Sequence, residues 1–149
     1  MTQITPLTLA ERGRFVASAR NMVGTPFGHR GRSARKVDCV GLVALALASV
    51  GRTVADRRSY GRNPVQDGLR EVCEAHFGLP ITDAPQAGDV ALFAWGNTAP
   101  NHVGILFDHP NGGLAVVHAL AQNRRVIEHG LDAKTRQQIV AVYRPWSAA

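Results

Sequence analysis

A cysteine at the predicted start of a helix is the strongest candidate nucleophile in this sequence. Cys39 follows Asp38 and precedes an apolar stretch with no charged residue until Arg52. Asp38 is a favourable N-cap residue, so we expect a helix to begin at about Cys39. The dipole and the unsatisfied N–H groups at that helix end favour an anion, which predicts an easily formed thiolate. The alternative is that Cys39 is a small buried apolar residue, as most free cysteines are.

Two histidines are the candidate bases for this thiol. Strands are expected over 102–107 and 113–118, on either side of the turn sequence Asp-His-Pro-Asn-Gly-Gly. A hairpin centred on Pro110 would place His102 directly opposite His118, with Cβ atoms about 5 Å apart. A register shift of one residue would separate them, because successive residues face opposite sides of a strand.

The other thiol and the remaining imidazoles of the second half are expected to take no part in the chemistry. Cys73 and His76 lie one helical turn apart, but no second pair with matching spacing completes a metal site. We therefore expect both to be core residues, and we expect no metal or other cofactor. His109 and His129 are expected at the surface or in turns.

These residues require a buried helix packed on a sheet. Thr8 and Glu11 form a capping box, and apolar residues follow at helical spacing as far as Val23. The stretch after Cys39 has no polar face, so its helix must be buried on several sides. A further helix is predicted over 65–77. From Gly88 onward the pattern is that of short strands, expected at 90–95, 102–107, 113–118, 125–129 and 138–144.

The expected fold class is therefore α+β. We expect a single domain over residues 1–149, in which N-terminal helices and the buried central helix pack on an antiparallel β-sheet of about five strands. A chain of 149 residues, 45% hydrophobic and 19% charged, fits one globular domain. No apolar run approaches transmembrane length, and the N-terminus lacks the features of a secretory signal.

The formal net charge of +6 rests mainly on arginine and favours acidic partners. Nucleic acid is the weaker expectation, because no aromatic residues are interleaved with the arginines to stack on bases. Acidic cell-wall polymers and carboxylate-bearing peptides remain. The two cysteines form no disulfide framework, and we expect both to be reduced.

In their order along the chain, these residues resemble the NlpC-type cell-wall peptidases, a papain-like family of cysteine peptidases, and in particular its phage-encoded branch. The resemblance extends over about residues 12–132. The matching motifs are Gly-Thr-Pro-Phe at 24–27, Asp-Cys-Val-Gly at 38–41, Gly-Asp-Val at 88–90, His-Val-Gly-Ile at 102–105, Val-Ile-Glu-His at 126–129 and Leu-Asp at 131–132.

The resemblance implies a papain-like fold with Cys39 as nucleophile, His102 as general base and His118 as the residue that orients the His102 ring. It also implies that the Cys39 backbone N–H helps to bind the oxyanion at the helix end capped by Asp38. Family members hydrolyse the γ-D-glutamyl–diaminopimelate bond of peptidoglycan stem peptides. The reaction that the resemblance implies is thiol endopeptidase activity without a cofactor.

The candidate substrate-binding residues are Phe27, His29, Arg30, Arg32 and Trp95. Many relatives carry a tyrosine where Phe27 stands, and its hydroxyl is thought to help bind the oxyanion. Phe27 has no donor, so we expect either that His29 or another group replaces it or that catalysis is weaker. His29, Arg30 and Arg32 are candidates for binding substrate carboxylates, and the alternative is a solvated loop. Trp95 is a candidate wall of the cleft, and the alternative is that it caps the sheet.

The phage branch implies synthesis in a bacterial cytoplasm and delivery to the cell wall or periplasm as part of a phage or phage-like tail. The expected partners are then the peptidoglycan peptide and tail-hub or tail-tip proteins, with no membrane span. Two alternatives stay open. One is a non-catalytic tail-hub or assembly protein that keeps the fold, and the other is a related amidase or acyltransferase.

Overall fold

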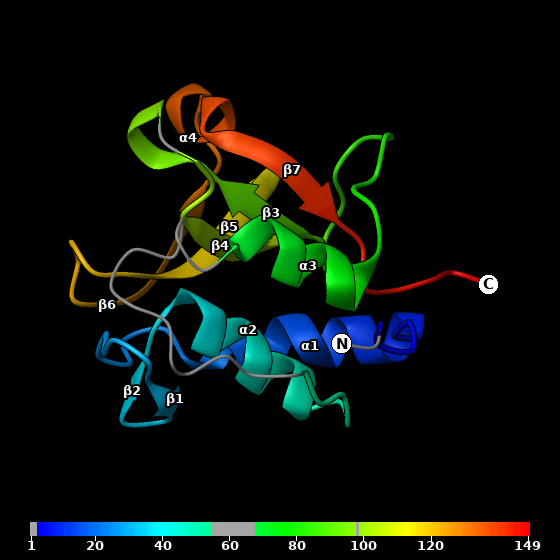
Figure 1. The fold of residues 1–149 in the computed structure, drawn as a ribbon, viewed down its shortest axis with the longest axis horizontal. Helices are drawn as coiled ribbons and strands as arrows, with labels where there is room; N and C mark the ends of the chain where they lie inside the picture. The colour runs from blue at the N-terminus through cyan, green and yellow to red at the C-terminus, as the bar shows by residue number, and fades with distance from the viewer. Residues whose placement is uncertain (1–2, 55–67, 98) are drawn as a thin grey trace.

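The computed structural model describes residues 3–54, 68–97 and 99–149 and has the predicted α+β architecture. Two helices lie together on one side of a five-stranded antiparallel sheet (Figure 1). They are α1 (Leu9–Asn21) and α2 (Cys39–Ala48). The sheet has the order β6-β5-β4-β3-β7. Its strands are β3 (Val90–Phe93), β4 (His102–Asp108), β5 (Leu114–Leu120), β6 (Arg125–Gly130) and β7 (Ile139–Tyr143).

Smaller elements complete the described part of the fold. A hairpin of β1 (Arg32–Ser33) and β2 (Lys36–Val37) lies beside the start of α2 (Figure 1). The 3₁₀ helix η2 (Trp95–Asn97) follows β3, so the strand predicted to reach Trp95 ends two residues earlier. The helix α3 (Leu69–Phe77) covers most of the helix predicted over 65–77, of which 65–67 lie outside the described residues. The last helix is α4 (Ala133–Gln137).

The burial of α2 follows from its composition. Every residue of α2 is apolar or glycine, so the helix has no polar face to turn towards solvent. It packs against α1 and against β4 and β5. Gly51 ends this segment with φ +75°, a left-handed conformation that glycine adopts at little cost. No helix within the described ranges is both long and apolar enough to span a membrane.

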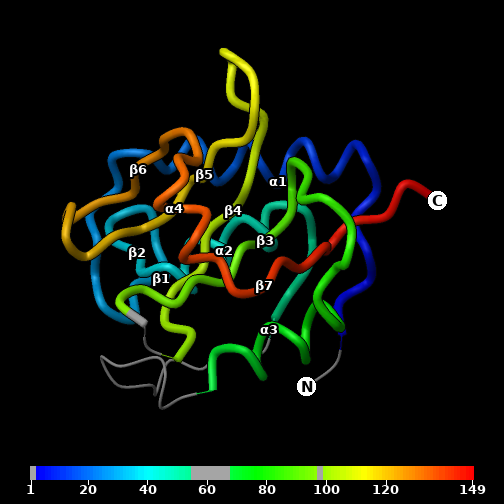
Figure 2. Tube along the Cα trace, turned by 90° about the horizontal axis from the view of Figure 1, so that it is seen from above, coloured from blue at the N-terminus to red at the C-terminus, as the bar shows by residue number. Residues whose placement is uncertain are grey.

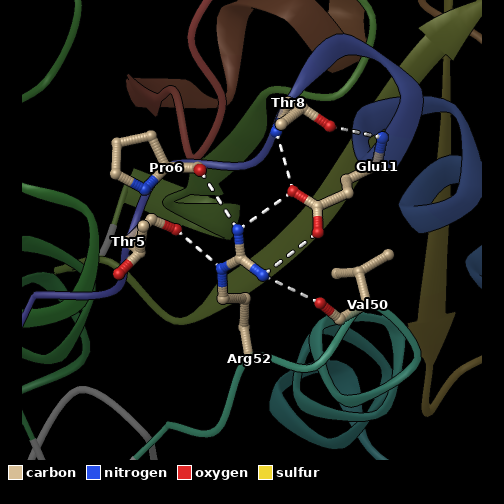
Figure 3. A network of polar contacts seen from close by, with 6 residues as sticks. All are labelled: Thr5, Pro6, Thr8, Glu11, Val50 and Arg52. Carbon is tan, nitrogen blue, oxygen red and sulfur yellow. Dashed lines mark hydrogen bonds and ion pairs between the residues drawn. The ribbon is translucent and has the colours of Figure 1, made fainter.

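Arg52 ties the end of α2 to the beginning of α1 (Figure 3). Its guanidinium bonds both carboxylate oxygens of Glu11, at 3.0 and 3.2 Å, and also donates to the Thr5 carbonyl at 2.8 Å. Glu11 and Thr8 form the predicted capping box. The contact therefore fixes one helix against the other at a point where both would otherwise leave polar groups unpaired.

The two faces of the sheet carry different clusters. The face towards α1 and α2 contributes residues such as Val103, Ile105 and Val117 to the main core. The opposite face forms a second, smaller cluster from Ala91, Phe93, Leu106, Val116 and Val142. Because side chains alternate along a strand, His102 and His118 belong to this second face.

The register between β4 and β5 differs from the prediction. Ile105 pairs with Val117, so continuation of the ladder places His118 beside Gly104 and not opposite His102. The turn between the strands contains Gly112 and Gly113, both with positive φ, which move its centre from Pro110 towards residue 111. The turn itself extends away from the body of the molecule (Figure 2). A shift of two residues keeps both histidines on one face.

Candidate active site

Cys39 is the first residue of α2, as predicted, and Asp38 is its N-cap. The Asp38 carboxylate accepts the Gly41 N–H at 2.7 Å. The thiol is 8% exposed and forms hydrogen bonds with the backbone groups of Val103 and Val40. The contact with Val103 places the nucleophile against the first residues of β4, whose first residue is His102.

The protonation of the thiol differs from the sequence-based expectation. Burial, and secondarily the Asp38 carboxylate, raise the pKa of Cys39 to about 12. The backbone bonds from Val103 and Val40 and the charge of Arg32 lower this pKa, but by less. The prediction of an easily formed thiolate is therefore wrong for the resting protein, because the cost of desolvating the anion exceeds the benefit of the helix end.

Asp38 organises the loop before α2 as well as the helix. Its Oδ2 accepts the backbone N–H of Arg30 at 2.9 Å, and its Oδ1 accepts the Arg32 guanidinium at 2.8 Å. A Cβ on Gly41 would collide with the Gly31 carbonyl, so this close approach requires glycine. The loop is thus held against the first turn of α2.

Of the two arginines proposed to bind substrate, only Arg30 is exposed. The Arg32 side chain is 5% exposed and forms an ion pair with the equally buried Asp38. The charge of Arg32 is thus used inside the protein, and its role in substrate binding stays a prediction. A buried carboxylate needs such a partner, and Arg32 supplies it.

His102 and His118 are joined side by side although they are not opposite in the sheet. Nε2 of His102 lies 2.8 Å from Nδ1 of His118, and both rings are buried. Burial lowers the pKa of His102 well below its usual value, with a smaller effect from His118. Burial, assisted by His129, lowers the pKa of His118 to about 3. Both imidazoles are therefore neutral at pH 7, as a general base must be.

His129, expected at the surface, is a third member of this arrangement. Its Nε2 lies 2.9 Å from Nε2 of His118, and its Nδ1 lies 2.9 Å from the Gly130 carbonyl oxygen. Sequence reasoning missed it, although it lies two residues from Ile127, the cross-strand partner of His118. The alternation of strand β6 was the signal that could have identified it.

Trp95 lies beside His102. Its ring stacks on Phe93 with centroids 4.9 Å apart, and its centroid is 5.6 Å from that of His102. The backbone N–H of Trp95 donates to Asn101 Oδ1 at 3.0 Å, which ties η2 to the start of β4. The indole thus forms one side of the His102 environment.

Phe27 and His29 lie in the loop that leads into α2. Phe27 bridges Val37 and donates its N–H to the Arg124 carbonyl at 2.8 Å, while its side chain packs on the main core. His29 is half-buried. Both residues therefore lie close to the start of α2 along the chain.

The second thiol is a core residue, as expected. Cys73 is 5% exposed in the main core, and burial raises its pKa to about 12. His76 is also buried and donates from Nδ1 to the Val72 carbonyl at 2.9 Å. Among residues 3–54, 68–97 and 99–149, no group of three potential metal ligands has the geometry to hold an ion.

The Asp89 of the Gly-Asp motif is an anchor for the C-terminal segment. Its fully buried carboxylate accepts Arg144 Nε at 3.0 Å, Trp146 Nε1 at 2.9 Å and the Gln86 N–H at 2.8 Å. These donors satisfy both oxygens. The motif therefore serves the fold and lies apart from the chemistry.

Comparison with known sequences identifies the family of this chain. A sequence model described as the NlpC/P60 family matches residues 24–144. Probable endopeptidases of two strains of Corynebacterium glutamicum are each 32% identical over 118 residues, which cover 78% of this chain. The chain spans about half the length of these curated relatives, with 47% and 46% of them covered.

Solved structures share the fold. A lipoprotein-like NLP/P60 protein of Staphylococcus aureus superposes with TM-score 0.64 at 18% identity, covering 99% of this chain and 45% of that one. An NlpC/P60 protein of Bacillus cereus gives 0.65 at 18%, covering 91% and 40%. The NlpC/P60 domain of the peptidoglycan hydrolase SagA gives 0.60 at 19%, covering 89% and 97%.

Proposed function

Because the chain belongs to the NlpC/P60 family, we propose that it is a cysteine endopeptidase that hydrolyses peptidoglycan stem peptides. The observation that carries the proposal is at the start of β4. There the Val103 backbone bonds the Cys39 thiol, and the adjacent His102 carries an imidazole held by His118. The relatives named as probable endopeptidases, and the likeness to a solved peptidoglycan hydrolase domain, support this class of reaction.

In the proposed reaction, Nδ1 of His102 takes the thiol proton as Cys39 Sγ attacks the peptide carbonyl carbon. Both groups start neutral, since burial raises the pKa of the thiol and lowers that of the imidazole. The oxyanion forms at the N-terminus of α2, where the Cys39 N–H is a donor that the helix cannot satisfy itself. His102 then protonates the leaving amine, and water hydrolyses the acyl-enzyme.

The proposed scissile bond is the γ-D-glutamyl–diaminopimelate bond. Support comes from the sequence resemblance and from the net charge of +6, which favours a substrate with several carboxylates. Arg30 is an exposed arginine of the loop before α2 and is the proposed contact for one of them. Trp95 is the proposed wall on the His102 side.

Digestion of purified stem peptides with products identified by mass tests the proposal. Wild type should release one fragment that ends in D-glutamate and one that begins with the free amine of diaminopimelate. Cys39→Ala and His102→Gln should release neither, whereas Cys73→Ala, the matched control at a second buried thiol, should cleave normally. Equal cleavage by wild type and Cys39→Ala, or none by wild type, would contradict the proposal. Release at the muramoyl–alanine bond would indicate an amidase.

We further propose that the chain acts as a component of a phage or phage-like particle tail, bound to hub or tip proteins and carried to the cell wall or periplasm. The support is the resemblance of residues 126–132 to the phage-encoded branch. Mass spectrometry of purified particles from the source bacterium is the test. We expect the protein to be present in the particles at a constant ratio to the tail proteins, and its absence from them would contradict the delivery route. Presence without any wall cleavage would identify a non-catalytic tail component.

A further inference from the structure

Three imidazoles from three neighbouring strands form one continuous hydrogen-bonded chain. His102 Nε2 lies 2.8 Å from His118 Nδ1, and His118 Nε2 lies 2.9 Å from His129 Nε2. His129 Nδ1 lies 2.9 Å from the Gly130 carbonyl oxygen, which ends the chain. Each pair of adjacent rings has centroids 5.0 Å apart and planes inclined by about 55°.

The carbonyl at the end decides the position of every proton in this chain. A carbonyl oxygen can only accept, so Nδ1 of His129 carries a proton and, in the neutral ring, its Nε2 accepts. Nε2 of His118 must then donate, which leaves its Nδ1 to accept from Nε2 of His102. Nδ1 of His102 is left without a proton.

We propose that His129 is a positioning residue that, through His118, fixes His102 in the tautomer whose Nδ1 can accept the Cys39 proton. This inference rests on the proposed function, because it assigns the base that the peptidase reaction requires. It adds a residue that acts through another and touches neither the thiol nor the substrate. The Gly130 carbonyl fixes the tautomer of His129 and, through it, the tautomers of the other two histidines.

The same chain can disperse the charge that the reaction creates. When Nδ1 of His102 takes the thiol proton, its Nε2 proton can pass to Nδ1 of His118, and the Nε2 proton of His118 can pass to Nε2 of His129. Each N–H bond broken is matched by one formed, and the positive charge reaches His129. His102 keeps its Nδ1 proton for the leaving amine, and the two transfers reverse as that proton is given up, so that Nε2 of His102 regains its proton in the same step.

The surroundings of His129 suit a cation better than those of the inner rings. His102 and His118 are 5% and 0% exposed, whereas His129 is half-exposed. Hydrogen bonds from Thr135 lower the pKa of Asp132, the N-cap of α4, and His129 is close enough to lower it slightly further. A positive charge at the outer end is therefore both hydrated and next to a carboxylate.

The His129 ring is not required for strand pairing. Six residue pairs join β5 and β6 from Ala115↔Gly130 to Leu120↔Arg125, and this ladder is made by backbone groups. Replacement of the His129 ring therefore interrupts the hydrogen-bonded chain of histidines and leaves the sheet intact. His109 offers a matched control: it is also half-exposed, its ring lies near Gly130, and its Nδ1 accepts the Asn111 N–H within its own turn.

The decisive measurement is the ring tautomer of each histidine in the intact protein, by nitrogen-15 NMR at pH 7.5 without substrate. Wild type should show protons on Nε2 of His102 and His118 and on Nδ1 of His129. His129→Phe should leave His102 as a mixture of tautomers, while His129→Gln, whose side-chain oxygen can accept from His118, and His109→Phe should keep the wild-type pattern. A proton on Nδ1 of His102 in wild type would overturn the proposal.

Kinetics give the second readout. With stem peptide, His129→Phe should lower kcat about tenfold with KM changed less than twofold, because only the proton transfers are affected. His129→Gln should recover most of the loss, and His109→Phe should match wild type. Unchanged kcat in His129→Phe would also refute the role. If wild type cleaves no peptide, the proposed function fails while the NMR result still judges the tautomer chain.

Discussion

His102 and His118 share a 2.8 Å hydrogen bond between their rings, although the residue beside His118 on strand β4 is Gly104. The bond therefore runs diagonally across the sheet. Diagonal neighbours on one face of a sheet can contact each other when their side chains are long or aromatic. The empty position at Gly104 is what gives the His118 ring room to turn towards His102.

Gly104→Ala should lower both stability and activity. The added Cβ would lie 2.7 Å from Val116 Cγ2 and 3.1 Å from His118 Cβ, so the buried ring must move. We expect the free energy of unfolding to fall by about 1–3 kcal/mol, the usual cost of overpacking a core. Urea unfolding and peptide cleavage measure the two effects. Gly13→Ala, whose Cβ would meet nothing within 4 Å, is the control and should be neutral or stabilising.

The protein should lose stability when the pH falls from 7.5 to 5.5. The pKa values of His102 and His118 are lowered in the folded state, so the unfolded chain takes up protons below about pH 6.5 while the folded protein does not. Each buried neutral histidine then costs about 1.4 kcal/mol per pH unit, or about 3 kcal/mol for both at pH 5.5. His118→Gln should show a smaller decrease. Unfolding free energies that stay constant over this range would contradict the lowered pKa values.

Alkylation of Cys39 should accelerate with pH throughout the neutral range. With its pKa raised to about 12, the thiolate fraction is small at pH 7 and increases about tenfold per pH unit. Iodoacetamide labelling of the Cys73→Ala protein, followed by mass spectrometry from pH 6 to 9, isolates this thiol. A rate that reaches a plateau below pH 8 would reveal a preformed thiolate–imidazolium pair in place of the neutral pair.

Arg32→Gln should destabilise the protein, whereas Arg30→Gln should not. Loss of Arg32 leaves the buried Asp38 carboxylate without its ion-pair partner, for which we expect about 3–5 kcal/mol of destabilisation. Arg30 contributes its backbone N–H to Asp38, which the substitution preserves. If Arg30 binds a substrate carboxylate, its variant should raise KM at unchanged stability. A stable Arg32→Gln protein with raised KM would instead return Arg32 to the substrate site.

The sequence by itself determined the three longer helices, the five strands of the main sheet and the position of the nucleophile, but not β1, β2, η2 or α4. The capping box at Thr8, the N-cap at Asp38 and the left-handed Gly51 act over a few residues, so their effects can be read from neighbours in the chain. The alternation of apolar residues likewise specified five short strands and the face shared by His102 and His118. Local backbone preferences and periodicity suffice for these features.

Only the tertiary structure decided the register, the charges and the third imidazole. The β4–β5 register depends on how two turn glycines are accommodated, and the ring contacts of His129 depend on the pairing of β5 with β6. The pKa of Cys39 depends on how completely the sheet and helices exclude water, and this outweighs the local effect of the helix end. Burial and cross-strand neighbours arise from residues distant in the chain, and for this reason local patterns do not contain them.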